Sequence, residues 1–249
     1  MGEERRQNTP LTPESPKALI KLLEEDWEMG KEDEREQLEE VACFVLASYV
    51  GGLRGEEAPL IYLGGMLEFW KEGEAHSTPH VMITLLGRFK GEDGDRFHCL
   101  PVADKTKSGI PIRKWFTRLL LRRTRVQGRT GGWLFCTRDK KGELTKVKAK
   151  LAQYDPLFKD YMTKVKDKFP GVIPEKCDPL AEFSLWRSGR RGSTTEAGNQ
   201  KVGADVIEMN NRWRKKMRAK GAAVFQNMRM VYTNVRAALL LRLRYSQSL

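Results

Sequence analysis

The chain has 249 residues, of which 40% are hydrophobic and 31% are charged, with a net charge of +12 at pH 7. A chain of this length can bury a sizeable core, and the composition is that of a globular protein. The sequence contains no run of about eighteen apolar residues, which excludes a typical membrane-spanning helix, and it opens without the apolar stretch of a signal peptide. We therefore expect an intracellular protein, nuclear if the organism is a eukaryote.

The positive charge is distributed unevenly along the chain. Residues 1–20 are neutral and residues 21–40 carry −7, so residues 41–249 carry +19. Residues 187–220 alone hold ten basic and three acidic side chains. A basic body of this size favours a polyanionic partner, with double-stranded DNA or RNA as first candidates. The alternative is that lysine and arginine only keep the surface soluble.

The cysteine pattern favours free thiols. No two cysteines form a C-x-x-C pair, and the three histidines do not complete a zinc-ligand spacing with them. We therefore expect buried, reduced cysteines and neither a metal nor a cofactor. The four residues are Cys43, Cys99, Cys136 and Cys177.

The first part of the chain predicts a leader followed by helices. Residues 1–15 are polar and proline-containing, which is typical of a disordered leader. Residues 16–50 have apolar side chains at helical spacing, with a break near Gly30. Ser15 can cap the first helix, and Pro16 suits a first helical position.

The middle of the chain predicts a small sheet and another helix. Residues 80–90 and 96–103 are β-like and flank a glycine-rich turn at residues 91–95, as in a hairpin. The pattern returns to a helix from Pro111 to Arg125. Residues 127–150 are basic and rich in turn-forming residues.

The last part of the chain is expected to be helical again. We predict a helix near residues 155–168, an irregular proline-containing connection, and helices that begin near Gly192 and near Asp205. A basic amphipathic helix, or two, is expected over residues 228–245. The sequence thus predicts a mostly α protein with a small antiparallel sheet (α+β), folded as one domain over residues 16–249.

Two segments in the second half form a motif. The first, RSGRRGSTTEA, starts at Arg187 and places Arg190 at its centre. Trp213 follows Arg190 by 23 residues, and MVYTNV then places Tyr232 before a threonine. The order resembles the second arginine box, the His or Trp position and the nucleophile segment of tyrosine recombinases, the phage-type integrase family.

A second pair of segments matches the same family upstream. YVGGLRGEE ends an apolar helix and places Glu57 three residues after Arg54, as in the family's first arginine box. Lys90 lies at the predicted hairpin, where the family carries a catalytic lysine. The resemblance covers about residues 40–245, in the correct order, and is closest to recombinases of eukaryotic mobile elements and large viruses.

The resemblance implies a DNA strand transferase, a site-specific recombinase or integrase that needs no metal. Arg54 and Arg190 would clamp the nonbridging oxygens of a phosphodiester, because guanidinium groups bind such oxygens in a planar, bidentate way. Tyr232 would attack phosphorus and form a 3′-phosphotyrosine. Lys90 would protonate the leaving 5′-oxygen, and Trp213 would support the clamp or donate its indole N–H.

Two departures from the family pattern put activity in doubt. Arg187 stands where the family has a histidine, and arginine cannot act as a base; its charge could instead lower the pKa of the tyrosine. Trp213 and Tyr232 are 19 residues apart, against about nine in the family, which suggests an inserted loop. A catalytically inactive DNA-binding relic and a type IB topoisomerase-like DNA-relaxing enzyme therefore remain as alternatives.

The ends of the chain carry two further expectations. Residues 1–40 are too short and too acidic for the N-terminal DNA-clamping domain of such recombinases, so we expect a catalytic domain alone. The helix after Tyr232 either docks on an adjacent protomer, within the tetramer on DNA that the resemblance implies, or packs on its own domain.

Overall fold

The computed structural model describes residues 9–75, 79–87, 95–210 and 235–249. The segments 1–8, 76–78, 88–94 and 211–234 lie outside the described residues, and three predicted site residues (Lys90, Trp213 and Tyr232) fall in them. The predicted turn at residues 91–95 also falls almost entirely outside. No described helix combines the length and the apolar character that a membrane crossing requires.

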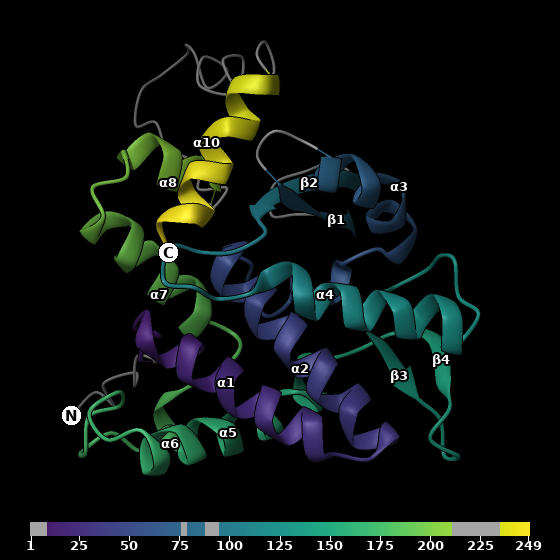
Figure 1. Ribbon diagram of the computed structural model, residues 1–249, viewed down its shortest axis with the longest axis horizontal. Helices are drawn as coiled ribbons and strands as arrows, with labels where there is room; N and C mark the ends of the chain where they lie inside the picture. The colour runs from purple at the N-terminus through teal and green to yellow at the C-terminus, as the bar shows by residue number, and fades with distance from the viewer. Residues whose placement is uncertain (1–8, 76–78, 88–94, 211–234) are drawn as a thin grey trace, which may run out of the picture.

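Helix α2 (Glu32–Val50) is the central element of the fold (Figure 1). Residues 41–50, the apolar stretch of its sequence, are all buried, because helices cover this end of α2 from several directions. Helix α1 (Glu14–Met29), helix α4 (Ile112–Leu121) and helix α7 (Ser188–Asn199) each pack against it. One continuous hydrophobic core results, which includes side chains from Leu11 to Leu249.

The predicted hairpin is confirmed as an antiparallel pair. Strand β1 (His80–Gly87) pairs with strand β2 (Arg96–Ala103), in a register that places His80 opposite Ala103 and Gly87 opposite Arg96. A 3₁₀ turn (Ala58–Leu60) leads into helix α3 (Leu63–Ala75), which covers one face of this pair. The predicted combination of helices with a small antiparallel sheet is therefore correct.

The region between α4 and α5 contains structure that we did not predict. Helix α4 and the π-helical turn that continues it (Arg122–Val126) correspond to the helix predicted from Pro111 to Arg125. The part that was not predicted is a second antiparallel pair, β3 (Cys136–Arg138) with β4 (Leu144–Lys148). In strand β4, Lys146, Val147 and Lys148 are all exposed. Its sequence therefore lacks the alternation of polar and apolar residues that predicts a half-buried strand, and it resembles a basic loop.

The second half is helical, as expected. A short 3₁₀ turn (Leu151–Gln153) precedes α5 (Asp155–Lys168), and α6 (Pro179–Glu182) lies in the proline-containing connection. Helices α7, α8 (Ala204–Asn210) and α10 (Val235–Ser248) form one end of the molecule, and β3 and β4 lie at the other (Figure 1).

Two expectations about the N-terminal segment are wrong. Residues 9–15 are not part of a disordered leader: the N–H of Leu11 donates to the carbonyl of Ser188, and the Leu11 side chain is buried. Helix α1 begins at Glu14 with Pro13 as its N-cap, so Ser15 is inside the helix and does not cap it.

The cysteine expectation is correct in part. No disulfide is formed among the four, and Cys43, Cys136 and Cys177 are buried. Cys99, which lies opposite Thr84 on β2, is exposed.

Helix α10 packs on its own domain. It contacts β2, α7 and α8, and its side chains Leu243, Tyr245 and Ser246 are buried. The Ser246 hydroxyl accepts a hydrogen bond from the N–H of Ala103 at 2.8 Å. For residues 235–249 the structure thus matches the second of the two expectations for the tail.

Candidate functional site

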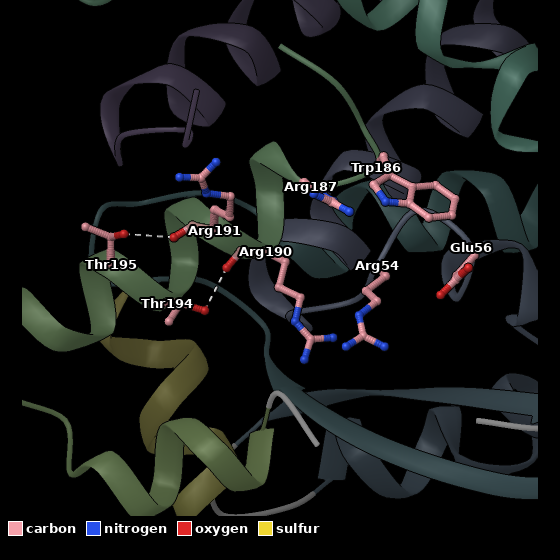
Figure 2. Close-up of a pocket in the computed structure, with 8 residues that line it drawn as sticks. All are labelled: Arg54, Glu56, Trp186, Arg187, Arg190, Arg191, Thr194 and Thr195. Carbon is pink, nitrogen blue, oxygen red and sulfur yellow. Dashed lines mark hydrogen bonds between the residues drawn. The ribbon is translucent and has the colours of Figure 1, made fainter. Parts of the chain in front are cut away.

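A cavity of about 580 Å³ opens where the first and the second arginine segments meet. We call it the arginine cavity (Figure 2). Four of its eight lining residues are arginines, and one is a glutamate. The lining residues are Arg54, Glu56, Trp186, Arg187, Arg190, Arg191, Thr194 and Thr195. All three predicted site residues that lie within the described part, Arg54, Arg187 and Arg190, are among them.

Glycines at the end of α2 position Arg54. The helix ends at Gly51, and Gly52 follows with a φ of +59°, a left-handed conformation that glycine adopts without strain. The chain reverses there and presents Arg54. The Arg54 side chain remains partly exposed, at 35% of its possible area, so it can reach a ligand from solvent.

Gly55 brings the two arginine segments together. Its N–H donates to the carbonyl of Trp186 at 3.2 Å, which joins backbones more than 130 positions apart in the chain. A Cβ at Gly55 would lie 2.8 Å from the Cα of Trp186. Only glycine therefore allows this approach, and the approach places Arg54 beside the start of α7.

Helix α7 holds Arg190 by close packing on its other faces. A Cβ at Gly189 would lie 3.0 Å from the Cβ of Ser48 in α2, and a Cβ at Gly192 would lie 2.0 Å from the carbonyl oxygen of Leu11. The two glycines of the second arginine segment thus let α7 lie directly against α2 and the N-terminal segment. We expected a helix to begin near Gly192, but α7 already begins at Ser188.

Glu57 links the two predicted clamp residues. Its carboxylate lies 3.9 Å from Nη1 of Arg54 and 3.5 Å from Nη1 of Arg190, and it accepts the backbone N–H of Arg54 at 2.8 Å. Glu57 and Arg190 are both buried. One carboxylate thus lies near two guanidinium groups whose residues are 136 positions apart in the sequence, and Figure 2 shows the side chains of Arg54 and Arg190 pointing the same way.

Three arginines lie at the N-terminal end of α7, where positive side chains are unfavourable. Arg187 is the N-cap residue, and Arg190 and Arg191 lie in the first turn. The N-terminus of a helix carries a partial positive charge and favours anions, so cations there cost stability. The same arrangement is suited to binding an anion such as phosphate.

The other residues that line the cavity differ in the hydrogen bonds and ion pairs of their side chains. Thr194 and Thr195 donate their hydroxyls to the carbonyls of Arg190 and Arg191, at 2.8 Å and 2.9 Å. Arg187 is exposed, and within the described part of the chain its side chain makes no ion pair or hydrogen bond. Arg191 points away from Arg54 and Arg190 in Figure 2.

Helix α10 closes the far side of α7. The Tyr245 hydroxyl donates to Oγ of Ser193 at 3.1 Å, and Ser193 in turn donates to the carbonyl of Arg190 at 3.1 Å. Burial raises the pKa of Tyr245, although its hydrogen bonds with Ser193, Thr194 and Asn210 oppose that rise. The tyrosine thus remains protonated and supports α7 from behind; sequence reasoning did not identify this contact.

Comparison with known proteins gives no family. Neither models of known protein families nor curated proteins match the chain. Among the described residues, no group of three or more His, Cys, Asp or Glu side chains is arranged to hold a metal ion.

Proposed function

We propose that this chain is a DNA strand transferase of the tyrosine-recombinase type, acting on double-stranded DNA. The observation that carries the proposal is that Arg54 and Arg190, chosen from two separate sequence segments, line one cavity and contact one carboxylate. Two oriented guanidinium groups can neutralise the charge that develops on the nonbridging oxygens of a phosphodiester under attack. Arg187 adds a third positive charge at the same cavity.

In this proposal, the described residues bind and orient the phosphate. The carboxylate of Glu57 fixes the two guanidinium groups before DNA binds, so less reorganisation is needed during the reaction. The nucleophile would be Tyr232 and the proton donor Lys90, both assigned from the sequence. Tyr232 would lose its hydroxyl proton to water, and its oxygen would form a bond to phosphorus while the bond between phosphorus and the 5′-oxygen breaks. The 5′-oxygen would take a proton from Lys90.

Covalent trapping tests the proposal. The protein is mixed with a pool of nicked DNA duplexes and quenched in SDS, and the parent is compared with Tyr232→Phe. We expect an SDS-stable protein–DNA adduct with the parent and none with the variant. Sequencing the trapped DNA would also identify the target site.

The alternatives predict different results. DNA binding without any adduct would contradict strand transfer and support the inactive DNA-binding protein. An adduct accompanied by relaxation of supercoiled DNA, without exchange between two duplexes, would support the topoisomerase-like enzyme. Strand exchange between duplexes, and a tetramer on DNA, are the outcomes that recombination requires.

A further inference from the structure

The arginine cavity has a second end with different chemistry. In Figure 2, Trp186 and Glu56 lie at one end, Arg191 and Thr195 at the other, and Arg54 and Arg190 between them. The first end thus combines a flat aromatic ring with a carboxylate, next to a pair of guanidinium groups. The arginines alone are enough to bind a phosphate. The indole of Trp186 and the carboxylate of Glu56 have no role in binding a phosphate, so their presence in the cavity indicates a further group on the ligand.

Trp186 is held in place but is left without a partner. Its backbone is fixed on both sides, because its carbonyl accepts the N–H of Gly55 and its N–H donates to Oγ of Ser184 at 3.1 Å. The side chain is among the large exposed hydrophobic residues, at 37% exposure. Within the described part of the chain, the indole makes no hydrogen bond and no stacking or cation–π contact.

Glu56 is equally available. It follows Gly55, so the same close backbone approach that fixes Trp186 also places Glu56 beside it. Its carboxylate is exposed and forms no ion pair within the described residues, in contrast to the buried Glu57. A carboxylate left unpaired among four arginines can accept hydrogen bonds from a ligand.

We infer that the Trp186–Glu56 end is a nucleobase subsite beside the phosphate held by Arg54 and Arg190. An exposed indole on a rigid backbone can stack on a base that has left the duplex stack. A carboxylate accepts hydrogen bonds from an exocyclic amino group, such as N4 of cytosine, and thymine has no such group. The subsite therefore takes an unpaired base next to the bound phosphate and favours cytosine over thymine. This inference rests on the proposed function, which supplies the phosphate.

Binding of single-stranded oligonucleotides tests the inference without knowledge of the target site. Fluorescently labelled dodecamers of dC, of dT and of abasic deoxyribose phosphate are titrated with the full chain at fixed salt, by anisotropy. We expect the parent to bind the dC dodecamer about tenfold more tightly than the abasic one, in the range that stacking of a base on an aromatic side chain gives. The dT dodecamer should lie between them.

Three variants assign the effect to its residues. Trp186→Ala should abolish the advantage of bases over abasic sites, and Trp186→Phe should retain most of it. Glu56→Gln should bring the affinities for dC and dT together. The inference is overturned if Trp186→Ala keeps the full advantage of bases, or if the parent binds dT as tightly as dC.

A fourth variant separates this inference from the proposed function. Arg54→Ala should weaken binding of all three dodecamers, the abasic one included, and should reduce the dependence on salt. If it does so while Trp186→Ala changes nothing, only the base subsite is wrong. If Arg54→Ala has no effect, or no dodecamer binds the parent, the phosphate site and the subsite that depends on it are both wrong.

Discussion

Helices α2 and α7 both begin with charged residues, but of opposite sign. The first turn of α2 holds Glu32, Asp33 and Glu34, which complement the positive end of the helix. Helix α7 has Arg187 as its N-cap residue and Arg190 and Arg191 in its first turn, and these positive charges oppose that end of the helix. The acids at α2 thus favour the start of their helix, whereas the arginines at α7 oppose theirs, and the anion binding that we propose would account for this difference.

The arginines near α2 and those that line the cavity also differ in how many carboxylates surround them. At α2, carboxylates and arginines form a largely buried ion-pair network, in which Arg122 binds the exposed Glu32 and the buried Glu39, and Arg123 binds the buried Glu36 and Glu40. Arg138 adds a further contact to Glu36 at 2.6 Å. The arginine cavity is lined by four arginines and one glutamate, and Glu57 beside it pairs with Arg54 and Arg190. In the network every arginine is matched by at least one carboxylate, whereas the cavity keeps a surplus of positive charge.

Breaking the network should give the largest loss of stability. Arg123→Ala would leave Glu36 and Glu40 buried without their main partner, so we expect the free energy of unfolding to fall by about 3–5 kcal/mol in urea denaturation. The matched control is Arg125→Ala, in the same π-helical turn but exposed, which should change stability by less than about 0.5 kcal/mol. Equal effects of the two variants would contradict the buried network.

Among the arginines that line the cavity, Arg190 should matter most for the proposed reaction, which Arg190→Ala tests. Removing one preorganised donor to a developing oxyanion typically slows a reaction by about 10²- to 10³-fold, so the rate of adduct formation should fall by that factor. Arg191→Ala, whose side chain points away from the pair in Figure 2, should give a clearly smaller decrease. Adduct formation at the parental rate in Arg190→Ala would remove this residue from the clamp.

Two glycines of α7 test how the site is held. In Gly192→Ala, the new Cβ would clash with the carbonyl oxygen of Leu11, so we expect a loss of about 1–3 kcal/mol in the free energy of unfolding. Gly198→Ala meets no atom within 4 Å in the same helix and should be neutral, or stabilising by about 0.5–1 kcal/mol. Similar stabilities for both variants would mean that α7 does not pack closely on the N-terminal segment.

The smallest expected effect is on acid stability. Burial favours the neutral form of Glu36, but a hydrogen bond from Gln127 and the charges of Arg123 and Arg138 outweigh it and hold its pKa below the usual 4.5. A lowered pKa in the folded state adds stability above pH 4.5 that is lost as the pH falls through the folded-state pKa.

Glu36→Gln should therefore lose less stability than the parent when the pH is lowered from about 5 to about 3. Burial raises the pKa of Glu40, so Glu40→Gln should not flatten this acid limb. Urea denaturation at a series of pH values measures both. An unchanged acid limb in Glu36→Gln would show that Glu36 is not held ionised by the network.

The sequence predicted the helices and the hairpin better than the contacts between them. Apolar periodicity was enough for α1, α2 and α5, and the order of the arginine segments was enough to select Arg54, Arg187 and Arg190. The partners of the acidic run could not be predicted, because Arg122 and Glu39 are 83 positions apart and nothing local links them. The order of residues 9–15 could not be predicted for the same reason, because the hydrogen bond from the N–H of Leu11 to the carbonyl of Ser188 joins positions 177 apart.

Within the site, glycine spacing was the signal that sequence reasoning missed. Gly55, Gly189 and Gly192 each mark a close backbone approach, but a glycine in a sequence does not say which segment approaches it. Glu57 was noted only for its spacing from Arg54, and its contact with Arg190 depends on that approach. Trp186 had no motif to draw attention to it.

The most direct test of the central claim is the salt dependence of duplex DNA binding, because it needs no target sequence. The variant Arg54→Ala/Arg187→Ala removes two charges from the cavity; Lys140→Ala/Lys141→Ala removes two exposed charges between β3 and β4, at the other end of the molecule (Figure 1). If the cavity binds a DNA phosphate, the slope of log affinity against log salt should become shallower by about 1 in the first variant and stay unchanged in the second. Parallel lines for the parent and the cavity variant would contradict the account.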